Sequence, residues 1–208
     1  MPMMRNKGFT LIEIAIVITI IGLLIAGVIK GMSLIQSAKV SSAITLAQDL
    51  SAAVTAFKQQ YHMLPGDMLI DSTTPEIPNV RTECMSGGSN KGDNNGLINA
   101  NESLCVPEVL FRAGLAKVDQ DAGWNVFQSS YGLVRVIATS LSGVVTTLGS
   151  NPFLPSITHV VEFENLPCDV VKEMDSKMDN GDLTSGKAIA SSGACAAGSI
   201  VPFYAVAL

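Results

Sequence analysis

The chain opens with an apolar run that contains a single acidic residue. From Phe9 to Ile29 the only strongly polar side chain is Glu13. An α-helix of that length spans roughly 30 Å, the thickness of the membrane hydrocarbon. A secretory signal peptide has a shorter apolar core that ends at a small-residue cleavage site, whereas this run continues into an amphipathic pattern. The pattern therefore predicts a transmembrane helix over residues 9–29.

Beyond Lys30 the apolar positions thin to a stripe. The stripe recurs at steps of three and four residues and consists of Ala43, Ala47, Leu50, Val54, Phe57 and Tyr61. This spacing places the stripe on one face of a helix, so residues 30–62 are expected to continue the same helix and pack it on a globular head. Pro65 and Gly66 then favour the end of the helix.

Residues 63–208 are expected to form that head. Its second half contains the β-favouring runs "SYGLVRVIATSL", "GVVTTL", "ITHVVEF", "GKAIA" and "SIVPFYAVAL", which are separated by Gly, Asn and Pro. Such runs predict the strands of an antiparallel sheet. The stretch "CDVVKEMDSKMDNGD" predicts a helix that stops at Asn180 and Gly181. A long helix followed by a sheet is the α+β fold class.

Glu13 requires a partner, because a carboxylate inside lipid costs a few kcal/mol. The apolar run supplies no Lys, Arg or His. A cut between Gly8 and Phe9 would create an amino terminus about one helical turn from the carboxylate. In a bundle of staggered copies, the amine of one copy could then meet Glu13 of the next.

The stretch "KGFTLIEIAIVITIIGLL" resembles the amino-terminal signature of type IV pilins and of the related type II secretion pseudopilins. The shared features are a short basic leader that ends in glycine, then Phe-Thr-Leu-Ile-Glu and a hydrophobic helix. By this resemblance residues 1–8 are a leader that a membrane peptidase removes after Gly8, and Phe9 becomes the methylated amino terminus. Glu13 is the acid needed for assembly, and residues 9–29 form both the membrane anchor and the fibre core.

The resemblance also implies a fold and a function. The fold is pilin-like, with the long helix packed on an antiparallel β-sheet head. The function is a structural subunit, a pilin or minor pilin, held by one span in the inner membrane with its head in the periplasm and then assembled into a fibre. The implied partners are other pilin subunits, the prepilin peptidase and the inner-membrane assembly platform. The alternatives are a type II secretion pseudopilin and, from another class, a membrane-tethered binding domain.

Four cysteines, Cys84, Cys105, Cys168 and Cys195, lie outside the apolar run on the side that would be exported. Disulfides are the default in an oxidising compartment, and four cysteines allow three pairings. Their spacing matches no zinc pattern of close pairs. We expect sequence neighbours to pair, Cys168 with Cys195, which the resemblance favours, and Cys84 with Cys105. Free buried thiols are the alternative.

Charge and motifs bring little further chemistry. The net charge of −5 gives no support for nucleic-acid binding. The stretch "GDLTSGKA" has the glycine and lysine spacing of a phosphate-binding loop, but Ala188 replaces the required Ser or Thr. His62 and His159 are the two histidines, and neither belongs to a nucleophile motif. We therefore expect neither an enzyme nor a cofactor.

One loop of the head is a candidate metal site. The stretch "KGDNNGLINANE" aligns with a calcium loop through Asp93, Asn95, Gly96 and Glu102, but Lys91 occupies the first ligand position, which should be acidic. A conventional calcium loop is therefore not expected, and no metal ligand is assigned. A site of another kind, built from Asp93, Asn95 and distant groups, is the alternative to a plain turn.

Overall fold

The computed structural model describes residues 10–73, 75–118 and 123–208. Helix α1 runs without a break from Leu11 to Tyr61 and contains no proline. It ends where His62 adopts a positive φ of 58° while its amide donates to the Lys58 carbonyl oxygen at 3.0 Å. The helix thus ends where expected, and His62 provides the left-handed turn before Pro65 is reached.

The chain divides into two compact units, one up to Lys39 and the other from Val40 to Leu208. In the first unit the large apolar side chains are exposed, with Leu11 at 93% and Leu34 at 72% of their full accessible surface. In the second unit the same helix buries a stripe that consists of Val40, Ala43, Ala47, Leu50, Ala53, Val54 and Phe57. The predicted stripe is confirmed, since these positions recur on one helical face.

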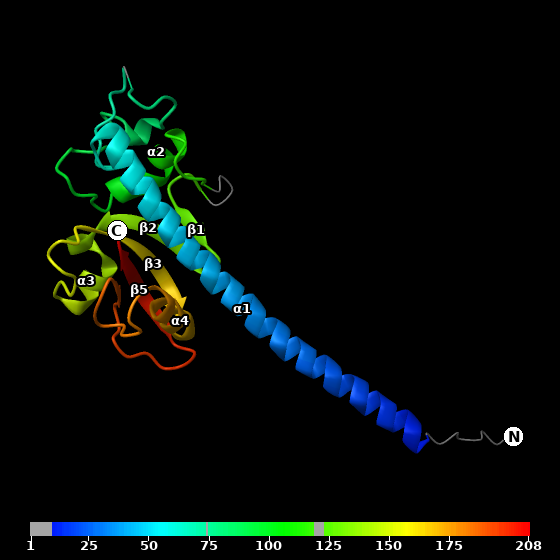
Figure 1. Cartoon of the computed structure of the whole chain (residues 1–208). Helices are drawn as coiled ribbons and strands as arrows, with labels where there is room; N and C mark the ends of the chain where they lie inside the picture. The colour runs from blue at the N-terminus through cyan, green and yellow to red at the C-terminus, as the bar shows by residue number, and fades with distance from the viewer. Residues whose placement is uncertain (1–9, 74, 119–122) are drawn as a thin grey trace, which may run out of the picture. The chain divides into compact units, whose positions relative to one another are not determined.

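The head contains one sheet of five strands, all paired antiparallel in the order β1-β2-β3-β5-β4. The strands are β1 (Phe127–Ser129), β2 (Gly132–Ala138), β3 (His159–Pro167), β4 (Ala188–Ala190) and β5 (Ile200–Ala207). Strand β5, the last element of the described chain, inserts between β3 and β4. The predicted α+β class, with a long helix packed on an antiparallel sheet, is confirmed (Figure 1).

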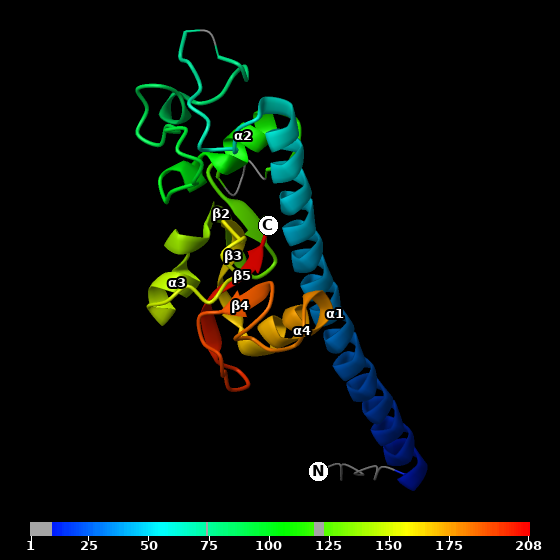
Figure 2. The ribbon, with the colours of Figure 1, turned by 60° about the vertical axis from the view of Figure 1, so that its left-hand side comes forward.

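Both faces of the sheet are covered. On one face Val136, Phe163 and Tyr204 join the α1 stripe in the main core. On the other face a smaller apolar cluster packs beneath η3 (Thr139–Leu141) and α3 (Gly143–Leu148), and it includes Val144 and Val160. Figure 2 shows α3 and the second half of α1 on opposite sides of the sheet. The alternation along each strand explains this arrangement, because successive side chains point to opposite faces.

Residues 143–148, "GVVTTL", form a helix, so the prediction of a strand there was wrong. Ser142 caps the helix by accepting a hydrogen bond from the Val145 amide, and Gly149 ends it at a positive φ of 70°. A Cβ on Gly143 would clash with the Phe203 ring, so this position needs glycine to sit against β5. Local capping and a close approach to the sheet thus outweigh the β propensity of the valines and threonines.

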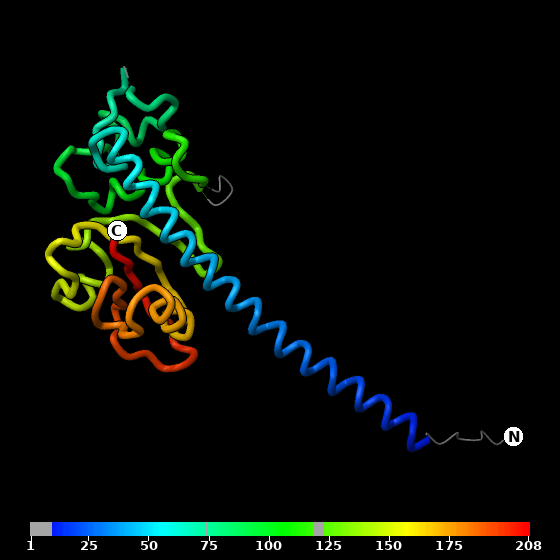
Figure 3. Tube along the Cα trace, in the orientation of Figure 1, coloured from blue at the N-terminus to red at the C-terminus, as the bar shows by residue number. Residues whose placement is uncertain are grey.

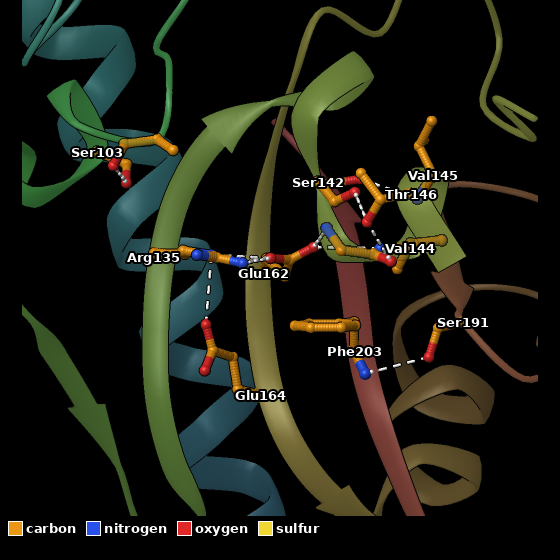
Figure 4. A network of polar contacts seen from close by, with 12 residues as sticks. Ser103, Arg135, Ser142, Val144, Val145, Thr146, Glu162, Glu164, Ser191 and Phe203 are labelled. Carbon is orange, nitrogen blue, oxygen red and sulfur yellow. Dashed lines mark hydrogen bonds and ion pairs between the residues drawn. The ribbon is translucent and has the colours of Figure 1, made fainter. Parts of the chain in front are cut away.

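A buried carboxylate fastens α3 to the sheet (Figure 4). Glu162 on β3 is fully buried and accepts a hydrogen bond from the Gly143 amide at 2.5 Å. Its other oxygen accepts from Arg135 on β2, whose Nη2 lies 2.7 Å away. Burial raises the pKa of Glu162, while the Arg135 charge and the two α3 amides oppose that rise. The ion pair with β2 and the hydrogen bonds from α3 thus offset the cost of burying the Glu162 carboxylate.

The segment between α1 and β1 is mostly loops. It includes η1 (Thr82–Cys84), η2 (Glu102–Leu104) and α2 (Val106–Arg112), and Figure 3 traces it around the end of α1. A disulfide joins Cys84 to Cys105, with 5.6 Å between their Cα atoms. The second disulfide joins Cys168, the first residue of α4 (Cys168–Met178), to Cys195, with 5.8 Å between Cα atoms. The described chain therefore has no free cysteine.

Candidate functional site

The apolar surface of the first unit is the most unusual feature of this chain. Within α1, leucine and isoleucine side chains between Leu11 and Ile35 are exposed on every side, unlike those of a soluble helix with one polar face. Among the described residues, α1 is the helix long and apolar enough to cross a membrane. Such a surface is stable only in lipid or against other apolar surfaces.

Glu13 sits in the first turn of this helix and is bound to Thr10. Its Oε2 accepts from the Thr10 amide at 2.8 Å and from the Thr10 hydroxyl at 2.9 Å. The Glu13 amide donates in return to the Thr10 hydroxyl oxygen at 3.3 Å. This is a capping box, in which the residue before the helix and the third helical residue satisfy each other's free amides. The Thr-x-x-Glu spacing was readable in the sequence, and sequence reasoning passed over Thr10.

The expected processing residues, Gly8 and Phe9, lie outside the described residues. Of the three expected N-terminal site residues, the structure therefore describes Glu13 alone. The cysteines, by contrast, lie in the head at two separate places, one disulfide beside η2 and the other at the start of α4.

A second candidate lies in the head, where three carboxyl groups meet. One oxygen each of Asp67, Asp93 and Glu102 lies within 4.8 Å of the other two. Asp67 and Glu102 are buried and Asp93 is exposed. The side-chain oxygen of Asn95 accepts instead from the Leu97 amide at 2.7 Å. The structure thus brings Asp93 and Glu102 together as the calcium alignment would require, and it adds Asp67, which lies outside the aligned stretch.

These carboxylates hold a loop by its backbone. Asp67 accepts from the amides of Asn95 and Gly96 at 2.9 and 3.0 Å. Glu102 accepts from the amides of Asp93 and Asn99 at 3.1 and 2.8 Å. Every oxygen of the two buried carboxylates therefore has a donor. The arrangement can take up a proton or an oxygen-preferring cation such as Ca²⁺, but its hydrogen bonds account for it as a structural clamp.

Burial raises the pKa of both Asp67 and Glu102. The loop amides oppose the rise, and the negative charge of Asp93 adds to it in each case. Because their native pKa values lie above the unfolded ones, these two groups weaken the fold at neutral pH relative to acid pH.

His159 holds the same loop from the sheet. Its Nε2 accepts from the Ile98 amide at 3.1 Å, and its Nδ1 lies 3.0 Å from the Thr158 hydroxyl oxygen. Nδ1 therefore carries the proton in the neutral ring. Burial, with a smaller effect of the Lys58 charge, lowers the pKa of His159 to about 4. His159 is thus a structural acceptor, and His62 serves the end of α1.

Two shallow hollows flank the head half of α1. One, of about 510 Å³, is lined by α1 residues such as Ala52 and by Met178 and Val206, and the other, of about 610 Å³, by Ala53 and Leu115 among others. The lining of the second hollow includes Asp49 and Lys117, whereas the lining of the first has no charged side chain.

Residues 3–29 match the model of the prokaryotic N-terminal methylation motif. This motif is the signature of type IV pilins and pseudopilins, so the resemblance of the opening residues is confirmed. Its family is structural and not enzymatic. No curated protein and no solved structure shows significant similarity to the chain. The match ends at residue 29, within the apolar first part of α1, and does not reach the head.

Replacing Asp93 by Asn should stabilise the head. The change removes a negative charge beside Asp67 and Glu102, so the free energy of unfolding at pH 7 should rise by about 1 kcal/mol. The gain should shrink as the pH falls, because protonation of the two buried carboxyls, whose pKa values are raised, removes the repulsion. The measurement is urea unfolding of the full chain in detergent. Asp49→Asn on α1 makes the same change in net charge away from the three carboxyl groups. Equal gains in both variants would show that Asp93 does not repel Asp67 and Glu102.

Acid should weaken the clamp at His159. Above pH 6.5 the ring is neutral in both the folded and the unfolded chain. Between pH 6.5 and about 4 the unfolded chain gains a proton that the native ring refuses, so stability should fall by about 3 kcal/mol. His159→Gln keeps an acceptor for the Ile98 amide without titrating. The difference in unfolding free energy between wild type and variant should therefore depend on pH, and a constant difference would show that the ring protonates freely when folded.

Proposed function

We propose that this protein is a structural subunit, a pilin or minor pilin, of a type IV pilus-like fibre. The chain is inserted in the inner membrane, cleaved between Gly8 and Phe9, methylated at Phe9 and then assembled. The observation that carries the proposal is the methylation motif at residues 3–29, which coincides with a helix start that is apolar on every side. Leader, acid and span occur in the order that such precursors have.

Assembly supplies what the exposed helix lacks in the isolated chain. The side chains of Leu11, Leu23 and Leu34 each expose more than two thirds of their surface. In the membrane they face lipid, and in the fibre they face the same segments of neighbouring copies. Residues 9–29 thus serve first as anchor and then as fibre core.

Glu13 makes that transfer specific. A carboxylate within the span is costly in lipid, and the first unit offers no cation closer than Lys30 among its described residues. Cleavage after Gly8 provides an ammonium group on each copy. The amine of one copy then pairs with Glu13 of another, and the surrounding apolar side chains strengthen that attraction by excluding water.

The head completes the subunit on the periplasmic side. Two disulfides suit an oxidising compartment, and no described group of residues forms a catalytic constellation around the histidines. We therefore assign the protein no enzymatic activity. Its partners are other pilin subunits, the prepilin peptidase that removes residues 1–8, and the inner-membrane assembly platform.

Processing provides the first test. Mass spectrometry of protein from the native membrane should show a chain that begins at methylated Phe9, and Gly8→Leu should keep the leader attached, because the peptidase would no longer recognise the junction. An intact leader on the wild-type chain, or a cut beyond Ile29, would contradict the proposal.

The charge of Glu13 provides the second test. Glu13→Gln keeps the length of the side chain and its capping acceptor but removes the charge. The variant should be stable, cleaved and membrane-bound. When it is coexpressed with wild type, its share of sheared fibres should fall about tenfold or more below its share of the membrane pool, since one partner of a desolvated ion pair is lost.

Asp49→Gln is the matched control, because it neutralises a carboxylate on the head half of the same helix. It should enter fibres at its membrane share. Equal incorporation of the Glu13 and Asp49 variants would show that the acid at residue 13 serves some other need.

A further inference from the structure

The two disulfides differ in how far solvent reaches their sulfur atoms. Cys84 and Cys105 expose 2% and 1% of their surface, and both belong to the main core. In the second bridge Cys168 is fully buried, whereas Cys195 is only half-buried and lies at the edge of that core. A thiol in solution can therefore approach one sulfur of the second bridge, while the first bridge is reached only after the core opens.

Cys195 lies in the loop that joins β4 to β5, residues 191–199. The bridge ties this loop to the first residue of α4. The Cys168 amide also donates to the Ser199 carbonyl oxygen at 2.8 Å, and Nζ of Lys172 on α4 donates to the Cys195 carbonyl oxygen at 3.0 Å. These contacts hold the loop against α4, and the bridge is the covalent one among them.

Cys168 is placed where a thiolate is stabilised. It is the first residue of the 11-residue helix α4, and Pro167 before it provides no side-chain cap. The free amides and the positive end of the helix dipole therefore face negative charge that develops on its sulfur. Asp169 in the first turn and Lys172 one turn further carry opposite charges, so the helix start remains the group that favours a thiolate.

We propose that Cys168–Cys195 is an exchangeable disulfide, opened at Cys195 by a dithiol reductant, whereas Cys84–Cys105 is a permanent bridge. A thiolate of the dithiol attacks Sγ of Cys195, the bond between the two cysteines breaks, and its electron pair leaves on Sγ of Cys168. The second thiolate of the dithiol then attacks the sulfur that is bound to Cys195, forms a disulfide within the reductant and releases Cys195. The protein disulfide is thus reduced and the dithiol is oxidised.

Opening this bridge frees residues 191–199 and leaves the sheet in place. Strand β4 is an edge strand of three residues, so it gives the loop little support. Strand β5 stays paired with β3 from Val160 and Ala207 to Pro167 and Ile200. The bridge therefore acts as a redox switch for the loop. This inference does not depend on the proposed function, because it concerns the head alone.

A monothiol shows which sulfur is attacked. The oxidised full chain in detergent is treated briefly with glutathione, the reaction is stopped with acid, and free thiols are capped with a maleimide in urea before peptide mapping. Glutathione should be found on Cys195 and the maleimide on Cys168. The buried bridge should open about tenfold or more slowly, because the core must open first. In urea, as the control, the two bridges should open at similar rates.

Glutathione mainly on Cys168, or equal opening rates of both bridges in the folded chain, would overturn the assignment.

Hydrogen exchange tests the release of the loop. After dithiothreitol has opened the bridge, the amides of residues 191–199 should exchange faster, while those of β2 and β3 keep their protection. The double variant Cys168→Ser with Cys195→Ser should give the same pattern without any reductant. Unchanged protection of the loop in both samples, or a loss of protection throughout the sheet, would show that the bridge is not a switch for this loop.

Discussion

The burial of one stripe of α1 against the sheet is the interaction on which the rest of the head depends. Seven side chains from Val40 to Phe57 supply the helix side of the main core, and β2, β3 and β5 supply the other. Because the helix continues toward the amino terminus without this stripe, the same element passes from a one-sided amphipathic surface to an apolar surface on every side. This change of pattern within one helix separates the part that folds the head from the part that we propose serves as membrane anchor and fibre core.

Helix α3, which covers the second face of the sheet, depends on polar contacts more than on the helix propensity of its residues. The pattern of apolar positions predicted α1 and its stripe, because a period of 3.6 residues is visible in the sequence alone. It did not predict α3, since "GVVTTL" has strand-forming side chains. The helix forms there because Ser142 caps it, Gly149 ends it and Glu162, from a strand further along the chain, meets its first amides. Contacts with residues that distant cannot be read from local composition.

The two candidate sites also differ in how far they could be predicted from the local sequence. The Thr10 and Glu13 pair lies within one turn, so its spacing alone predicts a capping box. Asp67 lies in the turn after α1, Asp93 in a loop and Glu102 in η2, and only the fold brings their carboxyl groups within 4.8 Å of one another. The sequence alignment with a calcium loop found Asp93 and Glu102, and it could not find Asp67, which lies outside the aligned stretch of residues 91–102.

The loop at residues 92–99 is held in place mainly through its backbone amides. Asp67, Glu102 and His159 bind amide groups that every residue except proline possesses. Solvent-facing side chains such as Leu97 can therefore be exchanged while the frame beneath them persists. Three positions of the loop are less free: a Cβ on Gly92 would clash with the Asp67 carbonyl oxygen, Gly96 has a positive φ of 85°, and the Asn94 side chain accepts from the Leu69 amide. The head thus carries a surface whose chemistry can diversify between lineages at little cost to the fold.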